Sequence, residues 1–273
     1  MFGPRSAMLT LYGDYVRHRG GEIGIGSLIK LLSHFGLSEQ SIRSSVSRMC
    51  RAGILKVRRN KSRSYYSLTE EGLAMMQKGE RRIFDRKRAK WNGFWNIVVY
   101  YIPEENREAR DRLRQELAWM GFGPLSTATW ISPHDLTDEV KELAEKLKVK
   151  QYIQVFQTRY QNTNDPESIV SRCWDLGKIR KRYAHFIKEY HERMEAHQKR
   201  ITDGVSIEPS EYFVERFKLI DDYRRLPYLD PDLPEELLPV NWPRSEATEL
   251  FDQYHDLLTE KANLYFDSVM ESY

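Results

Sequence analysis

Polar and guanidinium side chains gather on one side of the segment 38–51. Serine and glutamine can hydrogen-bond to the edges of DNA bases, while arginine can make paired hydrogen bonds to guanine or to a phosphate. The apolar residues Ile42, Val46 and Met49 recur at helical spacing, so the segment is expected to be a helix, with Ser38 as its N-cap and the polar side chains on its opposite face. The candidate DNA-contacting residues of this helix are Ser38, Gln40, Ser41, Arg43, Ser44, Ser47, Arg48 and Arg51.

A basic hairpin is expected directly after this helix. Residues 54–59 and 64–68 have the composition of strands and are joined through a short cationic segment, 60–63. Positive charge at the tip of a hairpin suits contact with DNA phosphates. The candidate DNA-contacting residues of the hairpin are Arg58, Arg59, Lys61 and Arg63.

Neighbouring elements must position this helix and hairpin. Residues 28–35 have an apolar stripe typical of a helix, with Ser27 as the expected N-cap and Gly36 at the end. Further elements are expected over 7–16 (helix), 22–25 (strand) and 70–85 (helix capped by Thr69). The polar helix alone, or the basic hairpin alone, is explained as solvated surface. Helix, turn, helix and basic hairpin in this order instead predict a winged helix-turn-helix.

The charge of the chain changes sign after Lys90. Up to that residue there are 19 Lys and Arg against 7 Asp and Glu, a net charge of +12; the remainder has 24 against 33, a net charge of −9. A strongly basic N-terminal third is typical of a nucleic-acid-binding module. The two cysteines have no disulfide-framework or metal-site spacing, and no segment has the form of a signal peptide or a membrane span. These features predict a cytoplasmic protein.

Residues 91–160 alternate between apolar strands and amphipathic helices. Strands are expected over 94–102, 127–131 and 152–156. One helix carries Leu113, Leu117 and Met120, and a second helix is expected over 136–148. This alternation predicts a small ferredoxin-like α/β domain.

Residues 161–273 have a different character, with long helices around a proline-rich stretch, 226–243. The helices are expected over 168–199 (broken or continued at Gly177), from Pro209 onward, and over 245–270. The predicted fold class is therefore α+β and multidomain. It comprises a DNA-binding domain over 1–90, the ferredoxin-like domain over 91–160 and a C-terminal helical domain over 161–273.

Several segments have unusual sequences: residues 12–14 with 19–23, residues 26–29, residues 63–69 and the proline-punctuated stretch 223–243. All four resemble segments of the PaaX-type family, the transcriptional repressors of phenylacetic acid catabolism, as do residues 119–125 and 173–176. The resemblance covers nearly the whole chain. Departures from the family pattern occur at Gly24, at Ser44 and Ser47, and at Lys61-Ser62. They concern the operator sequence more than the fold.

The resemblance implies a repressor whose central domain is similar to a small nuclease-like protein of CRISPR adaptation. It also implies a homodimer whose C-terminal helical domain responds to an aryl-acyl-coenzyme A, notably phenylacetyl-coenzyme A, without a cofactor. Such an effector requires cations for its phosphates and aromatic side chains around its acyl group. The candidate residues are Trp174, Tyr223, Arg224, Arg225 and Trp242. The alternative is that the aromatic residues are core and that the arginines pair with Asp221, Asp222, Asp230 or Asp232.

Two other functions are weighed against an effector-controlled repressor. A metal-dependent nuclease needs a carboxylate at the end of its first strand, where this chain has the uncharged residues 100–103. Glu104 and Glu105 follow, and they are explained by the start of a helix. We therefore expect a protein that is not an enzyme. A DNA-binding protein without an effector is the second alternative, and the ratio of specific to random DNA affinity distinguishes it.

Overall fold

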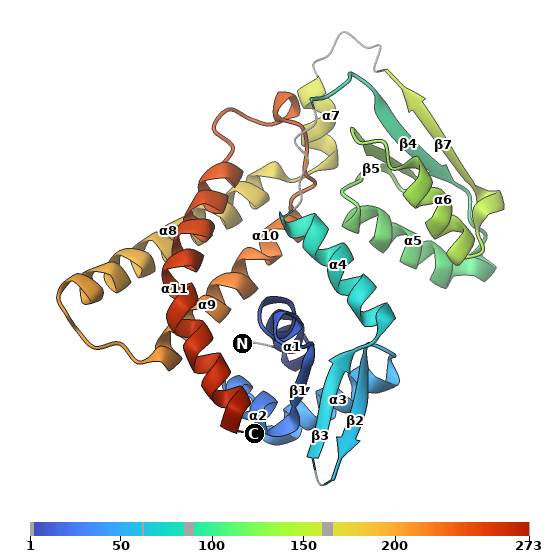
Figure 1. Ribbon diagram of the computed structural model, residues 1–273. Helices are drawn as coiled ribbons and strands as arrows, with labels where there is room; N and C mark the ends of the chain where they lie inside the picture. Colours follow the sequence, from blue (N-terminus) through green and yellow to red (C-terminus); the bar gives the residue numbers. More distant parts are fainter. Residues whose placement is uncertain (1–2, 62, 85–89, 160–165, 273) are drawn as a thin grey trace. The chain divides into compact units, whose positions relative to one another are not determined.

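The computed structural model describes residues 3–61, 63–84, 90–159 and 166–272, and it combines helices with two small antiparallel sheets (Figure 1). The α-helices are α1 (Pro4–Asp14), α2 (Ile25–Ser33), α3 (Glu39–Arg51), α4 (Glu70–Phe84), α5 (Arg107–Trp119), α6 (Thr137–Lys146), α7 (Pro166–Cys173), α8 (Leu176–Thr202), α9 (Pro209–Tyr223), α10 (Arg225–Leu229) and α11 (Arg244–Ser272). The strands are β1 (Glu22–Gly24), β2 (Leu55–Asn60), β3 (Arg63–Leu68), β4 (Trp95–Tyr100), β5 (Gly123–Ser126), β6 (Thr129–Ser132) and β7 (Ile153–Thr158). Single turns of 3₁₀ helix lie at Val16–His18, Glu104–Asn106, Lys150–Tyr152 and Glu235–Leu237.

The chain folds into two compact units, each built from separate parts of the sequence. The N/C unit comprises the described parts of 1–85, 184–225 and 244–273. The central unit comprises the described parts of 86–183 and 226–243. The segment 161–273, expected as one helical domain, thus contributes to both units, and the division falls within α8.

The N-terminal part of the N/C unit contains the helices and the hairpin that the sequence predicts. Its sheet has the order β1-β3-β2, with Glu22 opposite Ser67 and Leu55 opposite Leu68. The hydroxyl of Tyr12 in α1 donates to the backbone carbonyl of Tyr66 at 2.9 Å. The short strand 22–25 and the antiparallel hairpin are therefore confirmed as elements, with α1 attached to the central strand β3.

The start of α2 differs from the prediction. Gly24, in extended conformation, is the N-cap, and the helix begins at Ile25, two residues before the expected cap Ser27. Ser27 is buried inside the first turn, where its hydroxyl donates to the carbonyl of Val269 in α11 at 3.4 Å. Its small side chain therefore faces a packed helix rather than the helix end.

C-terminal helices complete the core of the N/C unit. The ring of Phe35, just after α2, stacks on Phe217 of α9 with centroids 4.1 Å apart. Tyr15 stacks on Phe266 of α11 at 4.8 Å and also contacts Phe213 at 5.4 Å. Figure 1 shows α11 running beside α9, with its C-terminal end beside α2. Apolar surface from α1 and α2 is thus buried against helices far away in sequence.

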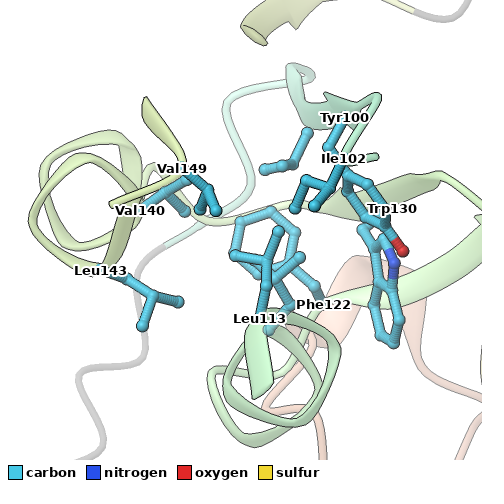
Figure 2. Packing of buried hydrophobic residues seen from close by; sticks show 10 residues of the cluster. Tyr100, Ile102, Leu113, Phe122, Trp130, Val140, Leu143 and Val149 are labelled. Carbon is cyan, nitrogen blue, oxygen red and sulfur yellow. The ribbon is translucent and has the colours of Figure 1, made fainter. Parts of the chain in front are cut away.

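The central unit contains a four-stranded antiparallel sheet with the order β5-β6-β4-β7. Its strands and helices follow one another as strand, helix, strand, strand, helix, strand. The predicted strands and helices are confirmed, and the structure adds a short strand, β5, that was not predicted. Gly and Pro at its start conceal it from pattern analysis. Figure 2 shows side chains of the sheet, α5 and α6 converging in one apolar core, including Tyr100, Leu113, Phe122, Trp130 and Val140.

The opposite face of this sheet packs against α7 and the proline-rich stretch. A Cβ atom at Gly123 would lie 2.6 Å from the Trp174 ring, and one at Gly121 would lie 2.7 Å from the carbonyl oxygen of Pro231. Both contacts require glycine. The long helix expected over 168–199 ends at Cys173, because Trp174 turns into this core, and restarts at Leu176, where Asp175 accepts from the Lys178 amide at 2.9 Å.

Candidate nucleic-acid interface

α3 presents the predicted polar side chains to solvent. Ile42, Val46 and Met49 are buried within the N/C unit. The Oγ atom of Ser38 accepts from the backbone amide of Ser41 at 3.3 Å, which confirms Ser38 as the N-cap. Ser41 is half-buried, whereas the other candidates on this helix are exposed: Ser38, Gln40, Arg43, Ser44, Ser47, Arg48 and Arg51.

These exposed side chains differ in their local contacts. Arg43 donates from Nε to Glu39 at 2.8 Å, and Arg48 donates to Ser44 Oγ at 2.9 Å. Arg51 has no hydrogen bond or ion pair from its side chain within the part of the chain that the structure describes. Exposed pairs one helical turn apart contribute only about 0.3–0.5 kcal/mol, so they exchange easily for contacts with a ligand. We call the exposed side chains of α3 that follow the N-cap the α3 face: Gln40, Arg43, Ser44, Ser47, Arg48 and Arg51.

The hairpin adds exposed cations beyond α3. Arg59, Lys61 and Arg63 are exposed, and Lys61 has the left-handed backbone conformation of a tight turn, with φ of 53°. Ser62 of the predicted cationic segment 60–63 lies outside the described residues. The strand register places Arg59 and Arg63 near the hairpin end, with Asn60 opposite Arg63. This region can therefore contact an extended anion.

Arg58 is engaged more firmly than the other hairpin arginines. Its Nε atom donates to both carboxylate oxygens of Glu22 at 3.0 and 3.1 Å, and its guanidinium lies 4.9 Å from the centroid of the Tyr65 ring. The hydrogen bonds to Glu22 raise the pKa of Arg58. The predicted phosphate contact by Arg58 would therefore come from a guanidinium already oriented by a carboxylate and a ring.

Three of the candidate effector residues lie together in the N/C unit. Arg224 donates from Nε to the buried Asp221 at 3.1 Å, and Arg225 also pairs with Asp221. The Tyr223 hydroxyl lies 3.0 Å from Thr248 Oγ1, and its buried ring stacks on Phe251 with centroids 4.0 Å apart. These contacts match the alternative in which the aromatic residue is core and the arginines pair with aspartate.

The two candidate tryptophans lie in the central unit. Trp174 is buried and donates from Nε1 to the carbonyl of Gly121 at 3.2 Å. The Trp242 ring meets Tyr183 edge-on at 6.2 Å, and its Nε1 atom is buried without a hydrogen-bond partner among the described residues. The five effector candidates are thus divided between two units, three in one and two in the other.

Sequence reasoning missed a buried arginine in the N/C unit. Arg216 of α9 is 5% exposed and donates to Asp14 at 3.0 Å, His255 at 3.1 Å and Asn263 at 2.8 Å. It therefore connects α1 with α9 and α11. A signal was present, because Arg216 lies four residues after Tyr212 on the apolar side of its helix.

Neither a metal site nor a membrane-spanning helix is found among the described residues. No group of three or more His, Cys, Asp and Glu side chains there has an arrangement that could hold a metal ion. No helix among those residues is both long and apolar enough to cross a bilayer.

Both the sequence and the fold of this chain are similar to those of known proteins. Family models match in three consecutive stretches: PaaX-like protein over 3–72, PaaX protein central Cas2-like domain over 88–170, and PaaX-like protein C-terminal domain over 174–268. The transcriptional repressor PaaX of Escherichia coli (strain K12) is 31% identical over 248 residues, or 90% of this chain and 77% of that protein. Uncharacterized protein Rv0674 from Mycobacterium tuberculosis has a similar fold, with a TM-score of 0.61 and 21% identity over 97% of this chain and 98% of that chain. The chain belongs to the PaaX family.

Proposed function

We propose that this protein is a DNA-binding transcriptional repressor and not an enzyme. One observation carries the proposal: an N-capped helix exposes the α3 face, and a hairpin with exposed cations follows it directly. The Escherichia coli relative, a transcriptional repressor by name, supports the same function.

The proposal assigns the N-terminal elements to a winged helix-turn-helix. α2 and α3 are its two helices, and β2 with β3 is its wing. In this assignment α3 enters the major groove and the wing tip contacts phosphates. The small side chains Ser44 and Ser47 allow close approach to base edges, while Arg43, Arg48 and Arg51 supply guanidinium groups. The strand and helix order of the central unit supports a ferredoxin-like assignment for that part.

The effector and the assembly are further parts of the proposal. The resemblance to repressors of phenylacetic acid catabolism supports a homodimer that leaves its operator when it binds phenylacetyl-coenzyme A or a related aryl-acyl-coenzyme A. Two recognition helices of a dimer bind half-sites about 34–36 Å apart, so a change in their separation weakens binding. Because Arg224 and Arg225 already pair with Asp221, an effector that uses them must compete with that carboxylate.

The central experiment compares the affinities of the full chain for its own promoter region and for random DNA of equal length. A specific regulator gives a ratio of about 10³ or more, whereas a DNA-binding protein without sequence preference gives a ratio near unity. Arg43→Ala is expected to reduce this ratio, and Lys61→Ala is expected to weaken both duplexes alike. Equal losses on both duplexes for both variants would contradict the assignment of α3 to base recognition.

A second titration tests the effector alone. Phenylacetyl-coenzyme A added to the promoter complex is expected to release the DNA, with free coenzyme A as the matched control. Unchanged promoter affinity would reject this effector and leave the repressor function standing.

A further inference from the structure

A cavity of about 630 Å³ opens at the base of the proposed wing, away from the hairpin tip. It lies between the turn that precedes β1 and the outer side of the three-stranded sheet. The residues that line it include Gly20, Gly21, Glu22, Lys56, Arg58 and Ser67. None of the residues lining it belongs to the α3 face.

The sheet register places three polar residues of this cavity side by side. Lys56 of β2 is opposite Ser67 of β3, which is opposite Glu22 of β1. Directly paired residues project from the same face of a sheet. Arg58, two residues beyond Lys56, projects from that face as well. An ammonium, a hydroxyl, a guanidinium and the Glu22 carboxylate therefore share one surface.

The charges in this cavity do not cancel. The Glu22 carboxylate is occupied by Arg58, which donates to both of its oxygens. Lys56 is exposed and has no ion pair among the described residues. Glu22, Lys56 and Arg58 together carry a net positive charge, and the uncompensated group is the Lys56 ammonium.

Backbone alone forms the neighbouring wall. Gly20 and Gly21 have φ values of 78° and 72°, a left-handed conformation that glycine adopts without strain. No heavy atom lies within 4 Å of the position that a Cβ atom would take at either residue. A bulky anion can therefore come close to the main chain at this turn.

We propose that this cavity receives a phosphate of the bound DNA duplex, with Lys56 as the contacting cation and Ser67 as a hydrogen-bond donor. This inference rests on the proposed DNA-binding function. Lys56 lies five strand residues from Lys61, a separation of about 16 Å along the strand. The hairpin would thus hold the DNA backbone at its base and at its tip.

The test measures how salt changes the affinity of the full chain for a random-sequence duplex. Each phosphate contact contributes about −0.9 to the slope of log K against log salt concentration. Lys56→Ala is expected to reduce the slope by about one contact, so its affinity deficit relative to wild type shrinks about 3.5-fold between 50 and 200 mM salt. Lys56→Arg is expected to keep the wild-type slope. Lys199→Ala removes an exposed lysine of α8 and is the matched charge control, expected to change nothing.

Each result decides between the possibilities. A wild-type slope for Lys56→Ala, with the thermal unfolding of the variant unchanged, overturns the inference and leaves the proposed DNA binding intact. Equal changes for Lys56→Ala and Lys199→Ala also overturn it, because they indicate a general charge effect. Saturable binding of inorganic phosphate that Lys56→Ala abolishes, without a change of slope on DNA, assigns the cavity to a free anion instead. Absence of DNA binding by the wild-type chain overturns the proposed function and this inference together.

Discussion

Two groups of arginines in the N/C unit have opposite surroundings. Arg51 and Arg59, near the end of α3 and in the hairpin, are exposed and have no carboxylate partner among the described residues. Arg216 and Arg224 of the C-terminal helices donate to Asp14 and Asp221. The residue type is the same, so burial beside a carboxylate distinguishes an arginine that holds the fold together from one that is available to a ligand.

The largest effect is expected when the buried arginine Arg216 is replaced. Arg216→Ala leaves the mostly buried Asp14 without its arginine partner, and loss of one partner of a buried ion pair costs about 3–5 kcal/mol. We expect a loss of that size in the free energy of unfolding, measured by urea denaturation. Arg51→Ala, with an exposed side chain, is the matched control. A loss below about 1 kcal/mol for Arg216→Ala would contradict a structural role.

The second test removes the shared carboxylate. Asp221 is fully buried and accepts from Thr10 at 3.2 Å as well as from Arg224 and Arg225. Hydrogen bonds that involve a charged group contribute about 1.5–3 kcal/mol each, so Asp221→Ala is expected to destabilise the fold by at least about 2 kcal/mol. Arg225→Ala, at a half-exposed side chain, is expected to cost less than 1 kcal/mol. A larger loss of unfolding free energy for Arg225→Ala than for Asp221→Ala would contradict this expectation.

The third test concerns an exposed arginine. Arg51→Ala is expected to change the free energy of unfolding by no more than about 0.5 kcal/mol. Its affinity for promoter DNA is expected to fall by about 1–3 kcal/mol, the usual contribution of a good arginine contact to a base. Thermal unfolding and fluorescence anisotropy on the same sample measure both quantities. A destabilised variant with unchanged DNA affinity would place Arg51 in the structural group.

The smallest effect comes from a buried histidine without a carboxylate partner among the described residues. His197 is 5% exposed, and its Nε2 atom has no hydrogen-bond partner among the described residues. Burial, followed by the charge of Arg200, lowers the pKa of His197, while Glu215 and Glu211 oppose that shift. As the pH decreases, His197 is therefore protonated in the unfolded chain before it is protonated in the folded chain. The free energy of unfolding falls as the pH drops below about 6.5.

Replacement of this histidine tests that sign. The ring of His197 meets Tyr212 edge-on at 4.7 Å, so phenylalanine can take its place among aromatic neighbours. His197→Phe is expected to flatten the dependence of unfolding free energy on pH between pH 5 and 7, measured by urea titration at each pH. A steeper dependence in the variant would show that burial does not disfavour the charged imidazole.

Local sequence signals predicted local structure well. Ser38 caps α3, and the Thr69 Oγ1 atom accepts from the Gly72 amide at 2.9 Å at the start of α4. Pro209 begins α9, where its missing amide proton costs nothing. The expected cap Ser27 was wrong, because a serine inside a helix and a serine at its start have the same local signature. The packing of α11 against α2 decided between them.

Long-range pairing could not be predicted in the same way. Periodicity marked Phe35, Phe213 and Phe217 as apolar helix positions. It could not say that the ring of Phe35 stacks on Phe217 and contacts Phe213, both far away in the sequence. The polar α3 face was predicted because it faces solvent and is defined by one helix alone. Lys56 was not among the predicted DNA-contacting residues. The phosphate contact proposed for it depends on the turn at Gly20 and Gly21 and on strands β1 and β3, which lie elsewhere in the sequence.

The N/C unit is built from the first and last parts of the chain, so it can be completed only late in protein synthesis. A ribosome releases the N-terminus first, and most domains fold as they emerge. Here α1 and α2 emerge long before α9 and α11, whose rings and buried arginine complete their core. A truncated translation product would carry the α3 face without the helices that support it. Full-length translation is therefore a precondition for a stable N/C unit.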